Sequence, residues 1–132
     1  MNRWSPPVTG TLGALVAALL LVGGHASLQA GSEGAPATQL QDLSKLAASA
    51  TEALKSGNVA AAKQRYRDFD QGWDRIEDGV RAKSRDIYRK IERAMSNVKL
   101  KLVKPNKPDQ AAALAALREL SATIDAALPG LR

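Results

Sequence analysis

The chain has 132 residues, of which 19 are lysine or arginine and 13 are acidic, and its formal net charge is +6. It contains no cysteine, which excludes disulfide-linked partners and thiolate metal sites. Charged residues of both signs are interspersed and aromatic residues are few, so we expect no nucleic-acid partner.

Residues 1–26 have the pattern of a signal peptide. Arg3 precedes the uncharged apolar run of residues 12–22, which is shorter than the roughly 20 residues that span a bilayer. Gly24-His25-Ala26 then supplies a cleavage motif with small residues at its first and third positions. We predict cleavage after Ala26, with Ala30 as the second choice, and therefore a periplasmic or secreted protein. An uncleaved membrane anchor is the alternative.

Cleavage after Ala26 would remove His25, the only histidine of the chain. Histidine-dependent catalysis is then excluded, and any metal site must use oxygen ligands. Oxygen ligands suit hard cations such as ferric iron, calcium and magnesium. Beyond the signal peptide we predict a flexible linker, residues 27–37, followed by a single helical bundle domain, residues 38–130.

Four amphipathic segments make up this domain. In each segment apolar residues recur at steps of three and four, which places them on one face of a helix. The first, residues 38–55, carries Leu40, Leu43, Ala47, Ala50 and Leu54. The second, residues 59–82, carries Val59, Ala62, Tyr66, Phe69, Trp73, Ile76 and Val80. The third, which ends near residue 103, carries Tyr88, Ile91, Met95, Val98 and Leu102. The fourth carries Leu114, Leu117, Leu120, Ile124 and Leu128.

Capping residues separate the four segments. Gly57 is placed to end the first, and Asn58, Ser84 and Asp109 are placed to cap the next three. Because short connections force neighbouring helices to be antiparallel, we predict an all-α fold, an antiparallel up-down four-helix bundle after a signal peptide. A three-helix core with a loose first or last helix is the alternative.

Two features of the second segment have more than one interpretation. Gly72 and Gly79 lie seven residues apart and so share a face. They either admit a close approach of a neighbouring helix or are tolerated surface glycines. The aromatic residues of the second and third segments are interpreted as core rather than as a ligand platform; they are Tyr66, Phe69, Trp73 and Tyr88.

Acidic side chains line one edge of the second segment's apolar stripe. Asp70, Asp74 and Glu77 lie at positions i, i+4 and i+7, and Glu77 follows a core isoleucine, as Glu92 does in the third segment. Repulsion between like charges four residues apart favours a neutralising cation. Asp70, Asp74, Glu77 and Glu92 are therefore the candidate oxygen ligands of a hard metal ion such as iron.

The same carboxylates have an alternative interpretation as a solvated face. Arg67 lies three residues before Asp70, and Arg81 lies four residues after Glu77, so ordinary surface ion pairs could neutralise the acidic stripe. Carboxylates alone could transfer protons, but no nucleophile, cofactor loop or histidine accompanies them. We therefore do not expect an enzyme.

The middle of the chain resembles a known family. The residues that carry the resemblance are Ala60-Ala61-Ala62-Lys63-Gln64-Arg65-Tyr66, Phe69, Trp73, Ile76-Glu77, Val80, Ser84, Tyr88, Ile91-Glu92, Met95 and Val98. They look like the extracytoplasmic helical domain of bacterial high-affinity iron permeases and, more distantly, like imelysin bundles. The resemblance implies an exported module that assists iron uptake, by binding the metal or by docking to a membrane iron permease or another envelope protein. The alternative is a structural or interaction bundle of the cell envelope that binds no metal.

Overall fold

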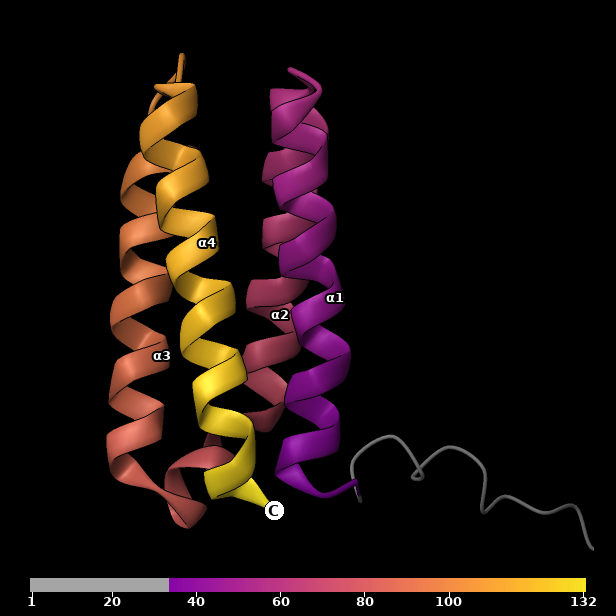
Figure 1. Ribbon diagram of the computed structural model, residues 1–132, viewed down its shortest axis with the longest axis vertical. Helices are drawn as coiled ribbons and strands as arrows, with labels where there is room; N and C mark the ends of the chain where they lie inside the picture. Colours follow the sequence, from indigo (N-terminus) through magenta and orange to yellow (C-terminus); the bar gives the residue numbers. More distant parts are fainter. Residues whose placement is uncertain (1–33) are drawn as a thin grey trace, which may run out of the picture.

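The computed structural model describes residues 34–132, and Figure 1 shows that this part of the chain is helical. Its elements are the helices α1 (Pro36–Lys55), α2 (Val59–Lys83), α3 (Arg85–Val98) and α4 (Gln110–Ala127), the π-helical turn η2 (Lys99–Val103) and the 3-10 turn η3 (Leu128–Leu131). The all-helical class and the four predicted helices are confirmed. The predicted signal peptide, its cleavage site and most of the linker lie outside the described residues.

The predicted caps begin three of the helices. In each case the side chain accepts a hydrogen bond from a backbone N–H three residues later: Asn58 from Ala61, Ser84 from Ile87, and Asp109 from Ala112. At the end of α1, Gly57 has a positive φ of 79°, a conformation that glycine adopts without steric cost. Its N–H donates to the carbonyl of Leu54, and the next N–H donates to the carbonyl of Ala53. These two bonds satisfy carbonyls that the helix end leaves free.

Two helix ends differ from the sequence prediction. The first helix begins at Pro36, two residues before the predicted start, because proline suits the first turn, where its missing N–H has no intrahelical partner. The third helix reaches residue 103 as predicted, but its last turn is π-helical, and the N–H of Lys104 donates to the carbonyl of Lys99 at 2.9 Å. Apolar residues spaced alternately three and four positions apart do not distinguish this wider turn from an α-helix.

Each helix packs against two others. α1 contacts α2 and α4, and α3 contacts α2 and α4, while η3 at the C-terminus returns to α1 (Figure 1). Fully buried leucines or isoleucines come from α1, α3 and α4 alike, for example Leu40, Ile91 and Leu120. Because every helix contributes to one core, the three-helix alternative is wrong. Within residues 34–132, no helix is long and apolar enough to cross a membrane.

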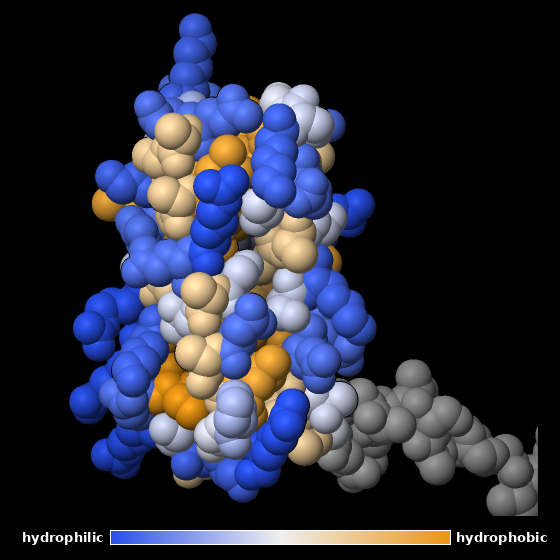
Figure 2. Space-filling model, viewed as in Figure 1, coloured by the Kyte–Doolittle hydropathy of each residue, from blue (hydrophilic) through white to orange (hydrophobic). Residues whose placement is uncertain are grey.

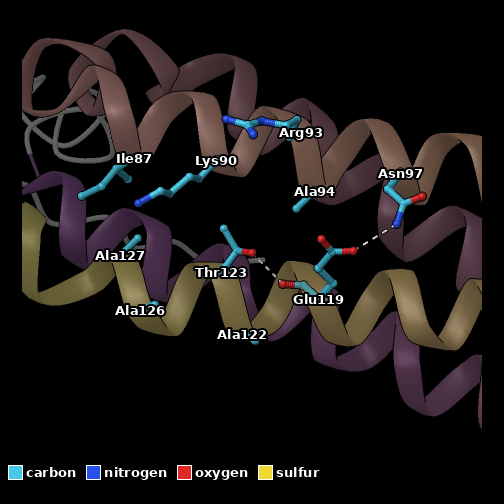
Figure 3. A pocket seen from close by; sticks show the side chains of 10 residues that line it. All are labelled: Ile87, Lys90, Arg93, Ala94, Asn97, Glu119, Ala122, Thr123, Ala126 and Ala127. Atoms are coloured by element: carbon cyan, nitrogen blue, oxygen red, sulfur yellow. Dashed lines mark hydrogen bonds between the residues drawn. The ribbon is translucent and has the colours of Figure 1, made fainter.

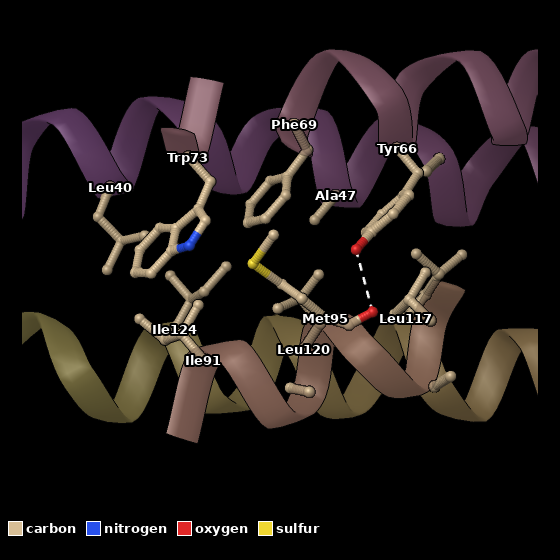
Figure 4. Packing of buried hydrophobic residues seen from close by; sticks show 14 of the residues in the cluster. Leu40, Ala47, Tyr66, Phe69, Trp73, Ile91, Met95, Leu117, Leu120 and Ile124 are labelled. Carbon is tan, nitrogen blue, oxygen red and sulfur yellow. Dashed lines mark hydrogen bonds between the residues drawn. The ribbon is translucent and has the colours of Figure 1, made fainter. Parts of the chain in front are cut away.

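The centre of the core is filled by aromatic side chains from α2. Tyr66, Phe69 and Trp73 are each at most 1% exposed, and Figure 4 shows them pointing toward side chains of the other helices, including Met95. Tyr66 and Phe69 are stacked with their ring centroids 6.1 Å apart. The interpretation of these three residues as core is confirmed, whereas Tyr88 is only partly buried.

The two glycines of α2 have different roles. At Gly72, which is buried, an added Cβ would lie 2.2 Å from Cδ2 of Leu43, so α1 approaches α2 closely there. At Gly79, which is exposed, the nearest atom to an added Cβ is Cγ of Pro36, at an ordinary contact distance of 3.7 Å. The close-approach interpretation therefore holds for Gly72, and the surface interpretation holds for Gly79.

These environments predict different effects of replacing each glycine with alanine. Gly79→Ala should raise the free energy of unfolding by about 0.5–1 kcal/mol, because alanine has the higher helix propensity and nothing obstructs its methyl group. Gly72→Ala should leave the free energy of unfolding unchanged or lower it by about 1–2 kcal/mol, since Leu43 must move to admit the methyl group. Urea unfolding followed by circular dichroism measures both. A stabilising Gly72→Ala variant would contradict the close approach.

Candidate functional site

The predicted metal ligands lie beside the contact between α2 and α3, hereafter the α2–α3 seam. Asp70 and Glu77 on α2 and Glu92 on α3 are partly buried, whereas Asp74 on α2 is exposed. Glu77 and Glu92 follow the buried Ile76 and Ile91, so their position next to the core agrees with the sequence pattern. Asp74, one turn from Asp70, makes no hydrogen bond or ion pair within the described residues.

Asp70 is held by a lysine from the other side of the seam. The Nζ atom of Lys99, at the start of η2, lies 2.8 Å from Oδ1 of Asp70, and the two side chains are 44% and 32% exposed. Arg67, the partner suggested by sequence spacing, forms no ion pair among the described residues. A cation of the protein itself therefore neutralises Asp70. At this exposure the pair stabilises the fold only modestly.

Glu92 accepts a hydrogen bond from the centre of the core. The indole nitrogen Nε1 of Trp73 donates to Oε1 of Glu92 at 2.5 Å. Because the indole is buried, its N–H requires an acceptor, and a carboxylate is a strong one. Glu92 thus connects α3 to the largest side chain of the core.

The negative charges of Glu77 and Glu92 both act on Tyr88 on α3. The pKa of Tyr88 is raised by desolvation first, and then by the negative charges of Glu92 and Glu77. Its ring stacks on Trp73 with a centroid distance of 6.1 Å, and the guanidinium of Arg81 lies 5.5 Å from its ring centroid. Arg81 also forms an ion pair with Asp78. The structure therefore brings Glu77 and Glu92 to one phenol from two helices.

Tyr66 joins the same seam from inside the core. Its hydroxyl donates to the carbonyl of Met95 on α3 at 3.0 Å. The pKa of Tyr66 is raised, most strongly by burial and then by the negative charges of Asp70 and Glu92. Ionisation of this phenol would place an unpaired negative charge in the core beside two carboxylates, so folding strongly favours the protonated form.

This pKa shift predicts a loss of stability at alkaline pH. Above the ordinary tyrosine pKa of about 10, the unfolded chain releases the proton that folded Tyr66 retains, so the free energy of unfolding falls as pH rises. In Tyr66→Phe the fall should be shallower, although the variant loses the hydrogen bond to Met95. Urea unfolding at pH 8 to 11 measures both slopes. Equal slopes in the two proteins would contradict the assignment to Tyr66.

The four predicted ligands are not drawn together into one cluster. Within residues 34–132, no group of three or more histidine, cysteine, aspartate or glutamate side chains is arranged to hold a metal ion. Two pairs share a neighbour instead: Glu77 and Glu92 at Tyr88, and Asp70 and Glu92 at Tyr66. Metal binding by these carboxylates stays a prediction.

A groove between α3 and α4 is a second candidate site. Its volume is about 580 Å³, and Figure 3 shows side chains of both helices around it. It is lined by Ile87, Lys90, Arg93, Ala94, Asn97, Glu119, Ala122, Thr123, Ala126 and Ala127. In Figure 2 apolar side chains are visible between these helices, with hydrophilic side chains around them. At one end Asn97 donates to Oε2 of Glu119 at 3.1 Å.

Sequence periodicity did not reveal this groove. The α4 side presents alanines, including Ala122 and Ala126, which are too small to fill the space beside α3. Lys90 and Arg93 contribute two cations from α3. The sequence signal that could have found the groove is the cluster of small residues on α4 outside its apolar stripe, together with the basic residues of the preceding helix.

Comparison of the chain with protein-family models, curated proteins and solved structures finds no match. The resemblance to iron-permease domains stays an expectation from the residues that carry it.

Proposed function

We propose that this protein is an interaction bundle of the cell envelope whose function requires no metal. The observation that carries the proposal is the hydrogen bond from buried Trp73 to Glu92, because it gives a candidate metal ligand a role in holding α3 to the core. The ion pair between Asp70 and Lys99 supports the same conclusion, since it neutralises a second candidate ligand. The location in the envelope rests on the predicted signal peptide.

The outer surface of the bundle, with the groove between α3 and α4, suits the binding of a partner. Short connections and the contacts of each helix with two neighbours support an antiparallel up-down arrangement, in which the core is closed on all sides. The groove between α3 and α4 stays open at the surface, with alanines within it and cations from α3 beside them. A partner would therefore bind the outside of the bundle, because large aromatic and aliphatic side chains fill its centre.

An iron-uptake module is the second candidate. It is favoured by Glu77 on α2 and Glu92 on α3, whose charges both act on Tyr88, because carboxylate oxygens are the ligands that hard cations prefer. Partial burial of these carboxylates raises the cost of leaving their charges uncompensated and so favours a bound cation. In this alternative the bundle would hold ferric iron near a permease.

Calorimetric titration with ferric citrate and with calcium separates the two candidates. The interaction bundle predicts no saturable heat beyond that of dilution. The iron-uptake module predicts saturable binding that disappears in the Glu77→Gln, Glu92→Gln double variant. The matched control replaces two exposed carboxylates of α1, as Asp42→Asn with Glu52→Gln, and removes the same charge away from the seam. Saturable binding that survives in this control but not in the seam variant would overturn the proposal.

A further inference from the structure

Positive charge is concentrated in one stretch of the chain. Residues 81–107, which comprise the end of α2, α3, η2 and the loop before α4, carry ten of the 19 lysine and arginine side chains but only two of the 13 acidic ones. This stretch alone is more positive than the whole chain, whose net charge is +6. The remaining residues are therefore net acidic, and the surface formed by residues 81–107 is called the basic side below.

Three arginines of α3 form a row along this side. Arg85, Arg89 and Arg93, called the arginine row below, follow one another at intervals of four residues and are all exposed. None of them forms an ion pair within the described residues, whereas Lys90 on the same helix is paired with Asp86 at 2.7 Å. Like charges at this spacing repel one another. Asp86 on the same helix interacts favourably with Arg89 and Arg93, and an anionic partner would supply further negative charge.

An exposed leucine lies beyond the arginine row. Leu100 in η2 is 54% exposed and is the one exposed large hydrophobic side chain in residues 34–132. It follows Arg93 by seven residues, about two helical turns, and Lys101 is its neighbour in the chain. Arg93 also borders the alanine-lined groove between α3 and α4. Cations of the basic side therefore adjoin apolar groups at Leu100 and at the groove.

We propose that the partner of this side is an anionic phospholipid bilayer. The inference rests on the proposed function, because it names the partner of the interaction bundle. Lipid phosphates would pair with the arginine row, while Leu100 and the groove would meet the region where acyl chains begin. An acidic polymer offers the charges without the apolar part, and so fits the leucine and the groove less well. Arginine also pairs with phosphate through two hydrogen bonds at once.

Vesicle co-sedimentation tests this proposal with the protein purified from the cells that produce it. The vesicles contain phosphatidylcholine either alone or mixed with phosphatidylglycerol. We expect binding to the anionic vesicles only, and weaker binding as sodium chloride is added. The Arg85→Gln, Arg89→Gln, Arg93→Gln variant should bind about a hundredfold more weakly.

A second triple variant controls for net charge. Arg65→Gln, Arg67→Gln and Arg75→Gln remove the same three charges from exposed positions of α2 and should leave binding within a few-fold of wild type. Circular dichroism confirms that both variants are folded. Because both variants have the same N-terminal segment as the wild type, any contribution of that segment to vesicle binding is the same in each. Equal losses in the two variants, or no binding of the wild type to anionic vesicles, would overturn the proposal.

Leu100→Ser distinguishes a bilayer from an acidic polymer. A bilayer predicts binding several-fold weaker than wild type, because the serine removes the apolar contact and leaves every cation in place. Unchanged binding of this variant, or complete competition by polyglutamate at equal charge, would overturn the bilayer in favour of a polyanion. Failure of vesicle binding leaves the metal titration unaffected, so the failure of this inference is distinguishable from the failure of the interaction-bundle proposal.

Discussion

Trp73→Ala should lower the free energy of unfolding by roughly 3–5 kcal/mol, the cost expected for truncating a large buried aromatic side chain. Trp73 is 1% exposed, stacks on Tyr88 and donates to Glu92, so the change leaves both a cavity and a carboxylate without its donor. Domains of this size are stable by only about 5–15 kcal/mol, and the variant should melt far below wild type.

Thermal melts followed by circular dichroism measure this effect. Trp73→Phe is the matched control, because it keeps much of the ring volume while it removes the N–H that donates to Glu92. We expect Trp73→Phe to lower the free energy of unfolding by less than Trp73→Ala does, mainly through the loss of the hydrogen bond to Glu92. A shift of only a degree or two in the melting temperature of Trp73→Ala would contradict the central position of the indole.

Leu40→Ala is expected to cost about 2–5 kcal/mol, because α1 is a full member of the core. Leu40 is completely buried and, in Figure 4, lies beside Trp73 and Ile124, which come from α2 and α4. Urea unfolding measures the loss. Leu100→Ala, at the exposed position in η2, is the control and should change stability by no more than about 0.5 kcal/mol. A small effect of Leu40→Ala would indicate a loosely docked first helix.

Much of the fold follows from local chemistry that a sequence displays. The caps at Asn58, Ser84 and Asp109 form as predicted because each involves a backbone N–H only three residues away. The apolar stripes identify the buried faces for the same reason, since helical periodicity is fixed by the backbone. The wider last turn at Lys99–Val103 escapes prediction because it changes the hydrogen-bond pattern and leaves the apolar spacing intact.

The partners of the carboxylates could not be predicted in this way. Spacing suggested Arg67 for Asp70, whereas the partner is Lys99, which lies far along the chain and reaches Asp70 only after α3 packs on α2. Glu92 was recognised as a residue beside the core, but its donor Trp73 belongs to another helix. Such pairs depend on the rotation of one helix about its axis and on its shift along that axis relative to its neighbour, and a single sequence specifies neither directly.

Charge is distributed unevenly along the chain. Over the whole sequence the two signs are interspersed, but acidic residues are scarce between residues 81 and 107. A net charge counted in successive windows would have revealed this. Exposure and pairing, which the structure adds, show that the arginine row is free of ion pairs within the described residues.

We propose that Asp70 and Glu92 at the α2–α3 seam serve the fold and that the protein functions without a metal there. Thermal unfolding of the protein in a chelator and in increasing ferric citrate tests it most directly, because a ligand that binds only the folded state raises the melting temperature with its concentration. We expect the same melting temperature at every concentration of ferric citrate. A melting temperature that rises with ferric citrate in the wild type, but not in the Glu77→Gln, Glu92→Gln variant, would contradict it.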